Sequence, residues 1–314
     1  MKKFVAILLT LMLVLGVSGA LAADTESVVI KKAYKLVGAG SSPAETFTLV
    51  QTGSEVTSGD ATAAPALGAI TGAAFDAGAA TSEGVTKPIT VNLPEYDRVG
   101  IYEYTLKEVK GNTAGVGYYD AAMKLVVTVV NGENGLERVA AVHTELAQGA
   151  DKSDTFENTY SAGTLTVKKT VTGNLGDKNK EFDFTVTFAA PQGKDWTPAI
   201  GLPEGATMVE NNPMSYTFKL KHDGTATFGN LPAGVTYTVT ETPVDGYTTT
   251  ISNDGKGTIV AGLNEVTCTN HKHGEIPTGV TTENLPYVLL IGFVVLAGAA
   301  LLIKRKAHNN QASD

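Results

Sequence analysis

The chain has 314 residues, with 32 acidic against 24 basic side chains and a formal net charge of −8 at pH 7. An acidic surface of this kind repels phosphate backbones, which argues against nucleic acid as a partner. The single cysteine, Cys268, excludes a disulfide within the chain, so we interpret it as a buried small apolar residue, with intermolecular pairing as the alternative.

The first segment is typical of a secretory signal peptide. Lys2 and Lys3 precede an apolar stretch over residues 4–17, and the small-residue sequence Ala20-Leu21-Ala22 follows it. This order of basic, apolar and small residues is the pattern that export machinery and signal peptidase use. We therefore expect residues 1–22 to be removed, with cleavage after Ala22, and the rest of the chain to be exported.

Alternating β-branched and aromatic residues predict a series of short strands in residues 23–162. The expected strands cover residues 28–32, 47–50, 89–93, 100–108, 124–130 and 138–145, and residues 156–158 close this half. The sequence Asn131-Gly132-Glu133-Asn134-Gly135 is a hairpin turn signal between the last two of these strands. Residues 59–84 are rich in Ala, Gly and Thr, and we interpret them chiefly as a long surface excursion with room for one short helix.

The second half of the chain repeats the plan of the first. Residues 165–169 match 28–32, residues 182–186 match the strand at Phe47, residues 234–241 match 100–108, and residues 268–270 match 156–158. We therefore expect two copies of one domain, residues 23–162 and 163–274. Many short alternating strands without a long helical period predict an all-β fold of two antiparallel sandwiches with immunoglobulin-like architecture.

Residues 275–314 have three parts in a fixed order. The pentapeptide Glu275-Ile276-Pro277-Thr278-Gly279 and a short polar spacer precede an apolar run over residues 287–303, and Lys304-Arg305-Lys306 follows it. The run is long enough for a transmembrane helix, and the basic residues should stay on the cytoplasmic side. A plain membrane anchor is the alternative, but it explains only the run and the charges and not the pentapeptide.

This three-part order resembles the cell-wall sorting signal of Gram-positive surface proteins. The resemblance implies that a sortase recognises Ile276 and Pro277 and cuts between Thr278 and Gly279. It also implies that Thr278 is then joined to an amine on another molecule.

Each repeat places a lysine, a glutamate and an asparagine on the apolar faces of its strands. Alternation puts Lys32, Glu108 and Asn158 inward in the first repeat, and Lys169, Glu241 and Asn270 inward in the second. Lys31 and Lys168 stand next to the two lysines, and alternation favours the second of each pair. A simple buried polar cluster is the alternative to a chemical role.

Burial gives these residue types a chemistry of their own. A buried amine loses its proton and becomes nucleophilic, whereas a buried carboxylic acid retains one. The lysine can then attack the asparagine side-chain carbonyl, while the acid donates a hydrogen bond to the developing oxyanion and passes protons to the departing ammonia. The expected product is a Lys–Asn amide.

These features together resemble the backbone pilins of Gram-positive bacteria, which are built from collagen-adhesin B-type domains with internal isopeptide bonds. The tandem Lys/Glu/Asn pattern, the turn at residues 230–234 before Tyr-x-Val-x-Glu, and Ile-Pro-Thr-Gly carry the resemblance. It implies a Lys32–Asn158 bond promoted by Glu108 and a Lys169–Asn270 bond promoted by Glu241. It also implies an accepting lysine a few residues before Asn158, for which Lys152 is the candidate, although a Tyr-Pro-Lys-Asn signature is absent.

The resemblance implies a wall-linked structural protein, the repeating subunit of a covalent pilus outside the cell, whose precursor passes through the membrane. Its expected partners are a sortase, identical subunits, minor tip or basal pilins, peptidoglycan and a host surface or matrix ligand. We expect no enzyme activity beyond one self-directed turnover, and no cofactor or metal, since His271-Lys272-His273 offers two ligands without a recognisable third. The alternatives are a singly anchored adhesin and an anchored glycan hydrolase, for which no acid pair is visible.

Overall fold

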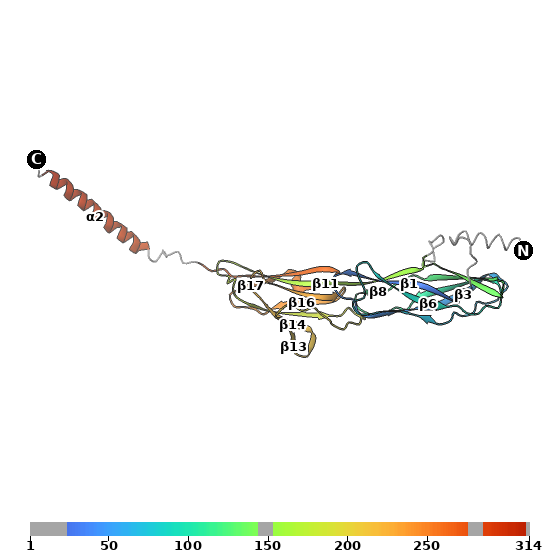
Figure 1. The fold of residues 1–314 in the computed structure, drawn as a ribbon. Helices are drawn as coiled ribbons and strands as arrows, with labels where there is room; N and C mark the ends of the chain where they lie inside the picture. The colour runs from blue at the N-terminus through green and yellow to red at the C-terminus, as the bar shows by residue number, and fades with distance from the viewer. Residues whose placement is uncertain (1–23, 144–152, 276–284, 312–314) are drawn as a thin grey trace.

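The computed structural model describes residues 24–143, 153–275 and 285–311, and Figure 1 shows two β-sandwiches arranged along one axis. The predicted all-β fold class, with one apolar helix near the C-terminus, is confirmed. The signal-peptide segment, Lys152 and the sorting motif Ile276-Pro277-Thr278-Gly279 lie outside the described residues.

The first sandwich is formed by two facing sheets and a small two-stranded sheet. Its strands are β1 (Ser27–Gly38), β2 (Glu45–Phe47), β3 (Leu49–Gly59), β4 (Ile70–Thr71), β5 (Ala73–Phe75), β6 (Val85–Asn92), β7 (Gly100–Glu108), β8 (Val116–Gly117), β9 (Met123–Asn131), β10 (Leu136–His143) and the first part of β11 (Thr155–Thr172). One sheet has the order β11-β1-β6-β4 and the other the order β10-β9-β7-β3, while β2 pairs with β5. Alternate residues such as Ile30, Tyr104 and Leu106 are fully buried between the sheets.

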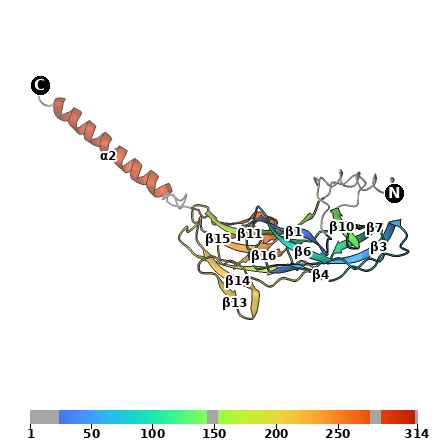
Figure 2. The ribbon, with the colours of Figure 1, turned by 45° about the vertical axis from the view of Figure 1, so that its right-hand side comes forward.

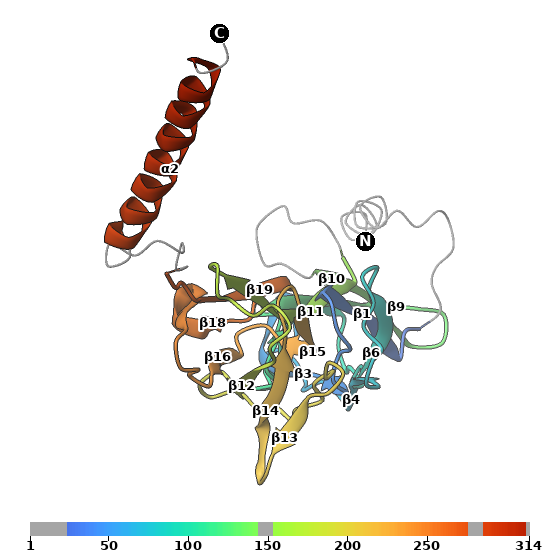
Figure 3. The same ribbon diagram turned by 90° about the vertical axis from the view of Figure 1, so that its left-hand side faces the viewer.

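The second sandwich has its own hydrophobic core. Its further strands are β12 (Phe182–Ala189), β13 (Thr207–Val209), β14 (Asn212–Leu220), β15 (Thr225–Pro232), β16 (Thr236–Glu241), β17 (Thr248–Ile251), β18 (Lys256–Thr258) and β19 (Gly262–His271), with a short 3-10 helix η1 (Ser252–Gly255). The sheet β13-β14-β12-β16-β18 faces a sheet in which β17, β19, β11 and β15 are neighbours. The hairpin of β13 and β14 projects from the side of this sandwich (Figures 2 and 3).

The 18-residue strand β11 belongs to both sandwiches. Its first half runs parallel to β1, from Lys31↔Thr155 to Gly38↔Ala162. Its second half runs parallel to β19, from Gly163↔Gly262 to Thr172↔His271. The first and last strands of each sandwich are therefore parallel neighbours, within sheets whose other pairings are antiparallel.

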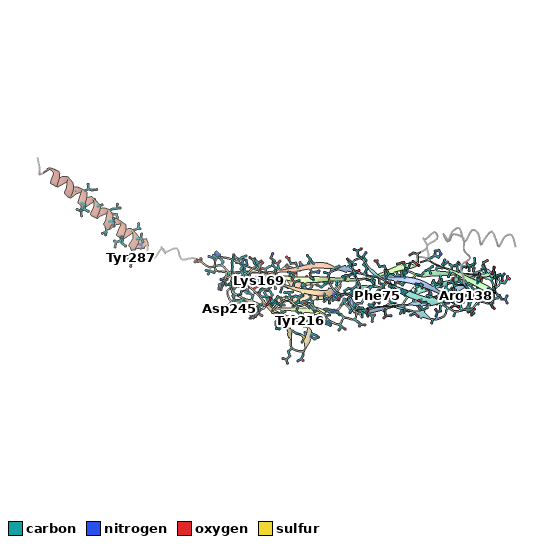
Figure 4. The ribbon with its side chains drawn as sticks, in the orientation of Figure 1. Phe75, Arg138, Lys169, Tyr216, Asp245 and Tyr287 are labelled. Atoms are coloured by element: carbon teal, nitrogen blue, oxygen red, sulfur yellow. The ribbon has the colours of Figure 1, made fainter. Side chains whose placement is uncertain are left out.

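The expectation that residues 59–84 form chiefly a surface excursion was wrong for their central part. No helix forms there; β4 and β5 do, and Ala73 and Phe75 are only 2% exposed. The Phe75 ring packs edge-on against Tyr34 and Phe47, with centroids 5.4 and 5.7 Å apart. Figure 4 shows Phe75 within the body of the first sandwich. This segment is held in place because it supplies an aromatic side chain to the first core.

Helix α2 (Leu285–Gln311) contains the apolar window Pro286–Lys304, which is long and apolar enough to cross a membrane. None of that window is buried against the rest of the described protein, and large side chains such as Phe293 and Leu296 are exposed. Such a surface requires an apolar environment, so the helix is consistent with a transmembrane segment.

Candidate functional site: two buried clusters of lysine, glutamate and asparagine

The first cluster lies between the sheets of the first sandwich. Lys32 comes from β1, Asn158 from β11 and Glu108 from the end of β7 in the facing sheet. The Lys32 Nζ donates to Glu108 Oε2 at 2.7 Å, and the Asn158 Nδ2 donates to Glu108 Oε1 at 2.5 Å. The side chains of Lys32 and Glu108 are fully buried, so one carboxyl group holds the amine and the amide together away from water.

The second cluster repeats this arrangement in the second sandwich. Lys169 comes from β11, Asn270 from β19 and Glu241 from the end of β16 in the facing sheet. The Lys169 Nζ and the Asn270 Nδ2 each donate to a different oxygen of Glu241 at 2.5 Å. The side chains of Lys169 and Glu241 are fully buried, and Figure 4 shows Lys169 within the body of this sandwich.

The two clusters share one strand register. Lys32 pairs with Phe156 and Tyr34 pairs with Asn158, so the asparagine lies opposite the residue two places after the lysine. In the second sandwich Lys169 pairs with Cys268 and Val171 pairs with Asn270, which is the same offset. Because residues two apart on a strand share a face, each lysine and asparagine point to the same side of adjacent strands.

The neighbouring lysines lie outside the cores, as strand alternation predicts. The Lys31 side chain is 53% exposed and forms an ion pair with Asp154 at 2.9 Å. Lys168 is also exposed. Only the second lysine of each pair is buried in its cluster.

Aromatic rings surround both buried amines. The Lys32 Nζ lies 3.8 Å from the centre of the Phe156 ring and 4.8 Å from that of Phe47. Loss of hydration on burial lowers the pKa of Lys32 to about 8, although the hydrogen bond to Glu108 acts in the opposite direction and raises it. In the second cluster the Lys169 Nζ lies 4.1 Å from the centre of the Phe182 ring. With its lowered pKa, the Lys32 amine is readily available as a neutral nucleophile.

The clusters differ in what contacts the asparagine oxygen. In the first, the backbone N–H of Tyr119 donates to Asn158 Oδ1 at 2.8 Å. In the second, Asn270 Oδ1 is buried and has no hydrogen-bond partner among the described residues. The sequence analysis missed Tyr119, because a backbone N–H donor leaves no side-chain signal in a sequence.

The clusters also differ at the position opposite the lysine, where Cys268 replaces Phe156. The prediction that Cys268 is buried is confirmed, since its exposure is 0%. Its thiol donates to Glu241 Oε2 at 2.8 Å, a contact that the sequence analysis did not anticipate. Burial raises the pKa of this thiol to about 12, and the hydrogen bond to Glu241 adds to the effect.

The two histidines considered as metal ligands, His271 and His273, lie beside each other at the end of β19. The His271 and His273 rings stack with centroids 6.3 Å apart. Within the described residues, no three His, Cys, Asp or Glu side chains form a group that suits a metal ion.

Comparisons with known proteins identify relatives of both halves of the chain. Residues 30–161 match a family described as a Spy0128-like isopeptide containing domain, and residues 163–272 match a domain family of unknown function. A pilin of Streptococcus pyogenes serotype M1 is 31% identical over 236 residues, which cover 67% of this chain and 69% of the relative. The pilus tip adhesin Cpa of Streptococcus pyogenes is 32% identical over 125 residues, which cover 38% of this chain and 18% of the adhesin.

The fold agrees with these relatives. The crystal structure of the major pilin from Streptococcus pyogenes superposes with a TM-score of 0.57 at 23% sequence identity, covering 80% of this chain and 100% of the other. Pilin homologues are structural proteins of the cell-surface pilus and not enzymes. The chain therefore belongs to the Gram-positive major pilins, the family that supplies the backbone subunits of pili.

Proposed function

We propose that this pilin closes one intramolecular isopeptide bond in each sandwich, Lys32 to Asn158 and Lys169 to Asn270. The observation that carries the proposal is the recurrence of a buried lysine, glutamate and asparagine with the same contacts and the same register in both sandwiches. The match of residues 30–161 to an isopeptide containing domain supports the first bond. The presence of the same cluster in both sandwiches argues against an accidental polar cluster.

The reaction needs only the amine, the amide and the carboxyl group that contacts both of them. A proton passes from the Lys32 ammonium to the Glu108 carboxylate across their 2.7 Å hydrogen bond, and the neutral amine attacks Cγ of Asn158. The amide oxygen takes up negative charge, and the acid returns a proton to the amide nitrogen, which leaves as ammonia when the oxyanion collapses. Glu108 then takes the remaining proton from the new amide nitrogen. Glu241 serves the second pair in the same way.

Mass spectrometry tests this proposal directly. Each closure releases one ammonia, so the folded chain should weigh two ammonia less than its sequence mass. Peptide mapping should recover the Lys32 peptide joined to the Asn158 peptide, and the Lys169 peptide joined to the Asn270 peptide. A folded protein with the full sequence mass would contradict the proposal.

We also propose that a sortase joins the subunits head to tail. The supporting observations are the Ile276-Pro277-Thr278-Gly279 motif and the apolar helix α2 that follows it. The sortase cuts after Thr278 and transfers its acyl group to Lys152 of another subunit. The partners are then the sortase, identical subunits, minor tip or basal pilins and, at the base, peptidoglycan.

The proposed precursor has four parts. Residues 1–22 are a signal peptide, 23–162 and 163–274 are the two domains, and 275–314 are the sorting signal. Separate hydrophobic cores and the family matches at 30–161 and 163–272 support the division between the domains.

A singly anchored adhesin is the second candidate, because part of the chain is similar to a pilus tip adhesin. Electrophoresis of wall extracts distinguishes the adhesin hypothesis from the backbone-subunit hypothesis. A polymerised backbone subunit gives a ladder of covalent multimers that survives boiling in detergent, whereas a singly anchored adhesin gives one band.

A further inference from the structure

We propose that the two isopeptide bonds close at different rates, with the backbone N–H of Tyr119 as the oxyanion donor that makes the first one faster. The inference rests on the proposed isopeptide function. It adds a catalytic group, the Tyr119 N–H, and assigns Cys268 as a residue that slows the second site.

The Tyr119 N–H points at the atom on which charge develops. It donates to Asn158 Oδ1 at 2.8 Å, and this oxygen becomes the oxyanion when the Lys32 amine adds to Cγ. A fixed donor at this place lowers the barrier, because its hydrogen bond strengthens as the charge grows and needs no reorganisation.

The local fold holds this donor in place. Strand β8 ends two residues before Tyr119 and pairs with the strand that carries Asn158, through Gly117↔Thr159 and Val116↔Tyr160. The Tyr119 ring packs on Phe156, with centroids 5.2 Å apart. The N–H is therefore fixed both through the backbone and through its own side chain before the reaction starts.

The second cluster has no equivalent donor among the described residues. Asn270 is fully buried, yet its Oδ1 makes no hydrogen bond there. The adjacent strand β17 pairs with β19 at Thr249↔Asn270 but directs no N–H at this oxygen. An oxyanion formed at Asn270 thus relies on Glu241 alone.

Cys268 is a second feature of this site that should slow formation of the Lys169–Asn270 bond. Its thiol donates to Glu241 Oε2, the oxygen that also accepts from the Lys169 Nζ. The thiol therefore competes with the Lys169 ammonium for the oxygen that must take up the lysine proton. In the first cluster the equivalent residue is Phe156, which offers no such donor.

The rates are measured with the full chain, recovered unfolded in urea and refolded by dilution into detergent. Samples are quenched in acid over time, and peptide mapping follows the two linked peptides separately. We expect the Lys32–Asn158 bond to form at least ten-fold faster, since one oxyanion donor is worth on the order of 100-fold in rate. Equal rates, or a faster second bond, would overturn the inference, whereas failure of both bonds to form would overturn the proposed function itself.

Two pairs of variants test which groups cause the difference in rate between the two bonds. Tyr119→Pro removes the N–H and is expected to slow the first bond by roughly 100-fold, whereas Tyr119→Ala keeps the N–H and should slow it far less. Protease resistance of the first sandwich reports whether the variant still folds, because the second bond lies in a sandwich with its own hydrophobic core. Cys268→Ala removes the thiol donor and should speed the second bond, and Cys268→Ser, which keeps a donor, should speed it less. An unchanged second bond in Cys268→Ala would remove Cys268 from the explanation, independently of the Tyr119 result.

Discussion

At the scale of single residues, each proposed bond depends on a carboxyl group that touches both of its partners. Glu108 contacts Lys32 and Asn158 through different oxygens, and Glu241 contacts Lys169 and Asn270 likewise. A group in this position can take a proton from the amine and give one to the leaving nitrogen without moving.

Replacing either glutamate should therefore stop one bond and leave the other. We expect Glu108→Gln and Glu241→Gln each to weigh only one ammonia less than its own sequence mass, instead of two, because the glutamine keeps the size of the side chain but cannot carry the proton. Glu103→Gln is the matched control, since Glu103 lies on the same strand as Glu108 but contacts Lys124 at the surface. Full bond formation in both cluster variants would show that the carboxyl groups are not needed.

A second residue-scale prediction concerns Asp24 and Arg138. The Arg138 backbone N–H and Nε donate to Asp24 Oδ1 at 2.9 and 2.8 Å, and the Arg138 side chain is only 8% exposed. Removing the carboxylate leaves a buried guanidinium without its main partner. Asp24→Asn should therefore reduce the free energy of unfolding by about 1 kcal/mol, the low end of the usual range, because Asp24 itself is partly exposed.

The pH dependence of this pair has a definite sign. The hydrogen bond from Arg138 holds the pKa of Asp24 below its ordinary value of 3.8. The pair therefore stabilises the folded state above pH 3.8, and this contribution is lost as the pH falls through the folded-state pKa. Urea denaturation should distinguish wild type from Asp24→Asn at neutral pH and give the same stability for both at strongly acid pH. A difference that persists in acid would mean that the carboxylate charge is not its source.

Sequence alone could identify the buried lysines, but not every group around them. Alternation separates Lys32 from Lys31 because a strand turns successive side chains to opposite faces. The Tyr119 N–H and the inward position of Phe75 depend on where loops fold back, and loop paths have no period in the sequence. The thiol contact of Cys268 was missed because a cysteine in an apolar pattern is normally only a small apolar residue.

At the scale of elements, strand β11 links the two proposed bonds, because each bond has one of its two residues on this strand. It carries Asn158, the target of the first bond, and Lys169, the nucleophile of the second. The sequence pattern predicts a strand at each end of β11 and a domain boundary between residues 162 and 163, where β11 continues without a break. Repeats in a sequence show that a unit recurs, and they do not show that two units share a strand.

Bond closure should stabilise each sandwich, because it ties the first strand to the last. For closed loops of about 100 residues, the chain-entropy model gives a stabilisation of roughly 4 to 5 kcal/mol per bond. Glu108→Gln and Glu241→Gln should each lower the melting temperature and shorten survival in protease. Unlike a disulfide, the stabilisation of the wild type should be unaffected by reductant. Matching melting curves for wild type and the variants would leave the bonds without a role in stability.

At the scale of the whole molecule, the two sandwiches form an elongated body that β11 crosses (Figure 1). Head-to-tail joining of such bodies needs one acceptor lysine distant from the donor Thr278. Lys152 stands three residues before the first residue of β11 and six before Asn158 in the sequence, so a link there enters the protein near the start of the shared strand.

Lys152→Ala should therefore leave monomers in wall extracts, and tandem mass spectrometry of digested wild-type fibres should show the Thr278 carboxyl joined to the Lys152 side chain. The control variants replace another lysine, and alanine in place of Lys124, Lys178 or Lys194 should leave the ladder of multimers intact. Lys124 is already paired with Glu103 at 2.5 Å. A normal ladder from Lys152→Ala would place the acceptor at another lysine.

The proposed links also fix the path that carries tension through a fibre. Force that enters at Lys152 runs along β11 to Lys169, crosses the second bond to Asn270 and leaves through Thr278, so the first bond lies off this path. Glu241→Gln fibres, which lack the second bond, should lengthen by roughly 330 Å per subunit when pulled, since about 100 residues between Lys169 and Asn270 can then extend. Glu108→Gln fibres should stay as short as wild type, because their second bond still bypasses the folded sandwich. Single-molecule stretching of fibres checks this, and lengthening of the Glu108→Gln fibres as well would mean that force enters the subunit upstream of Lys152.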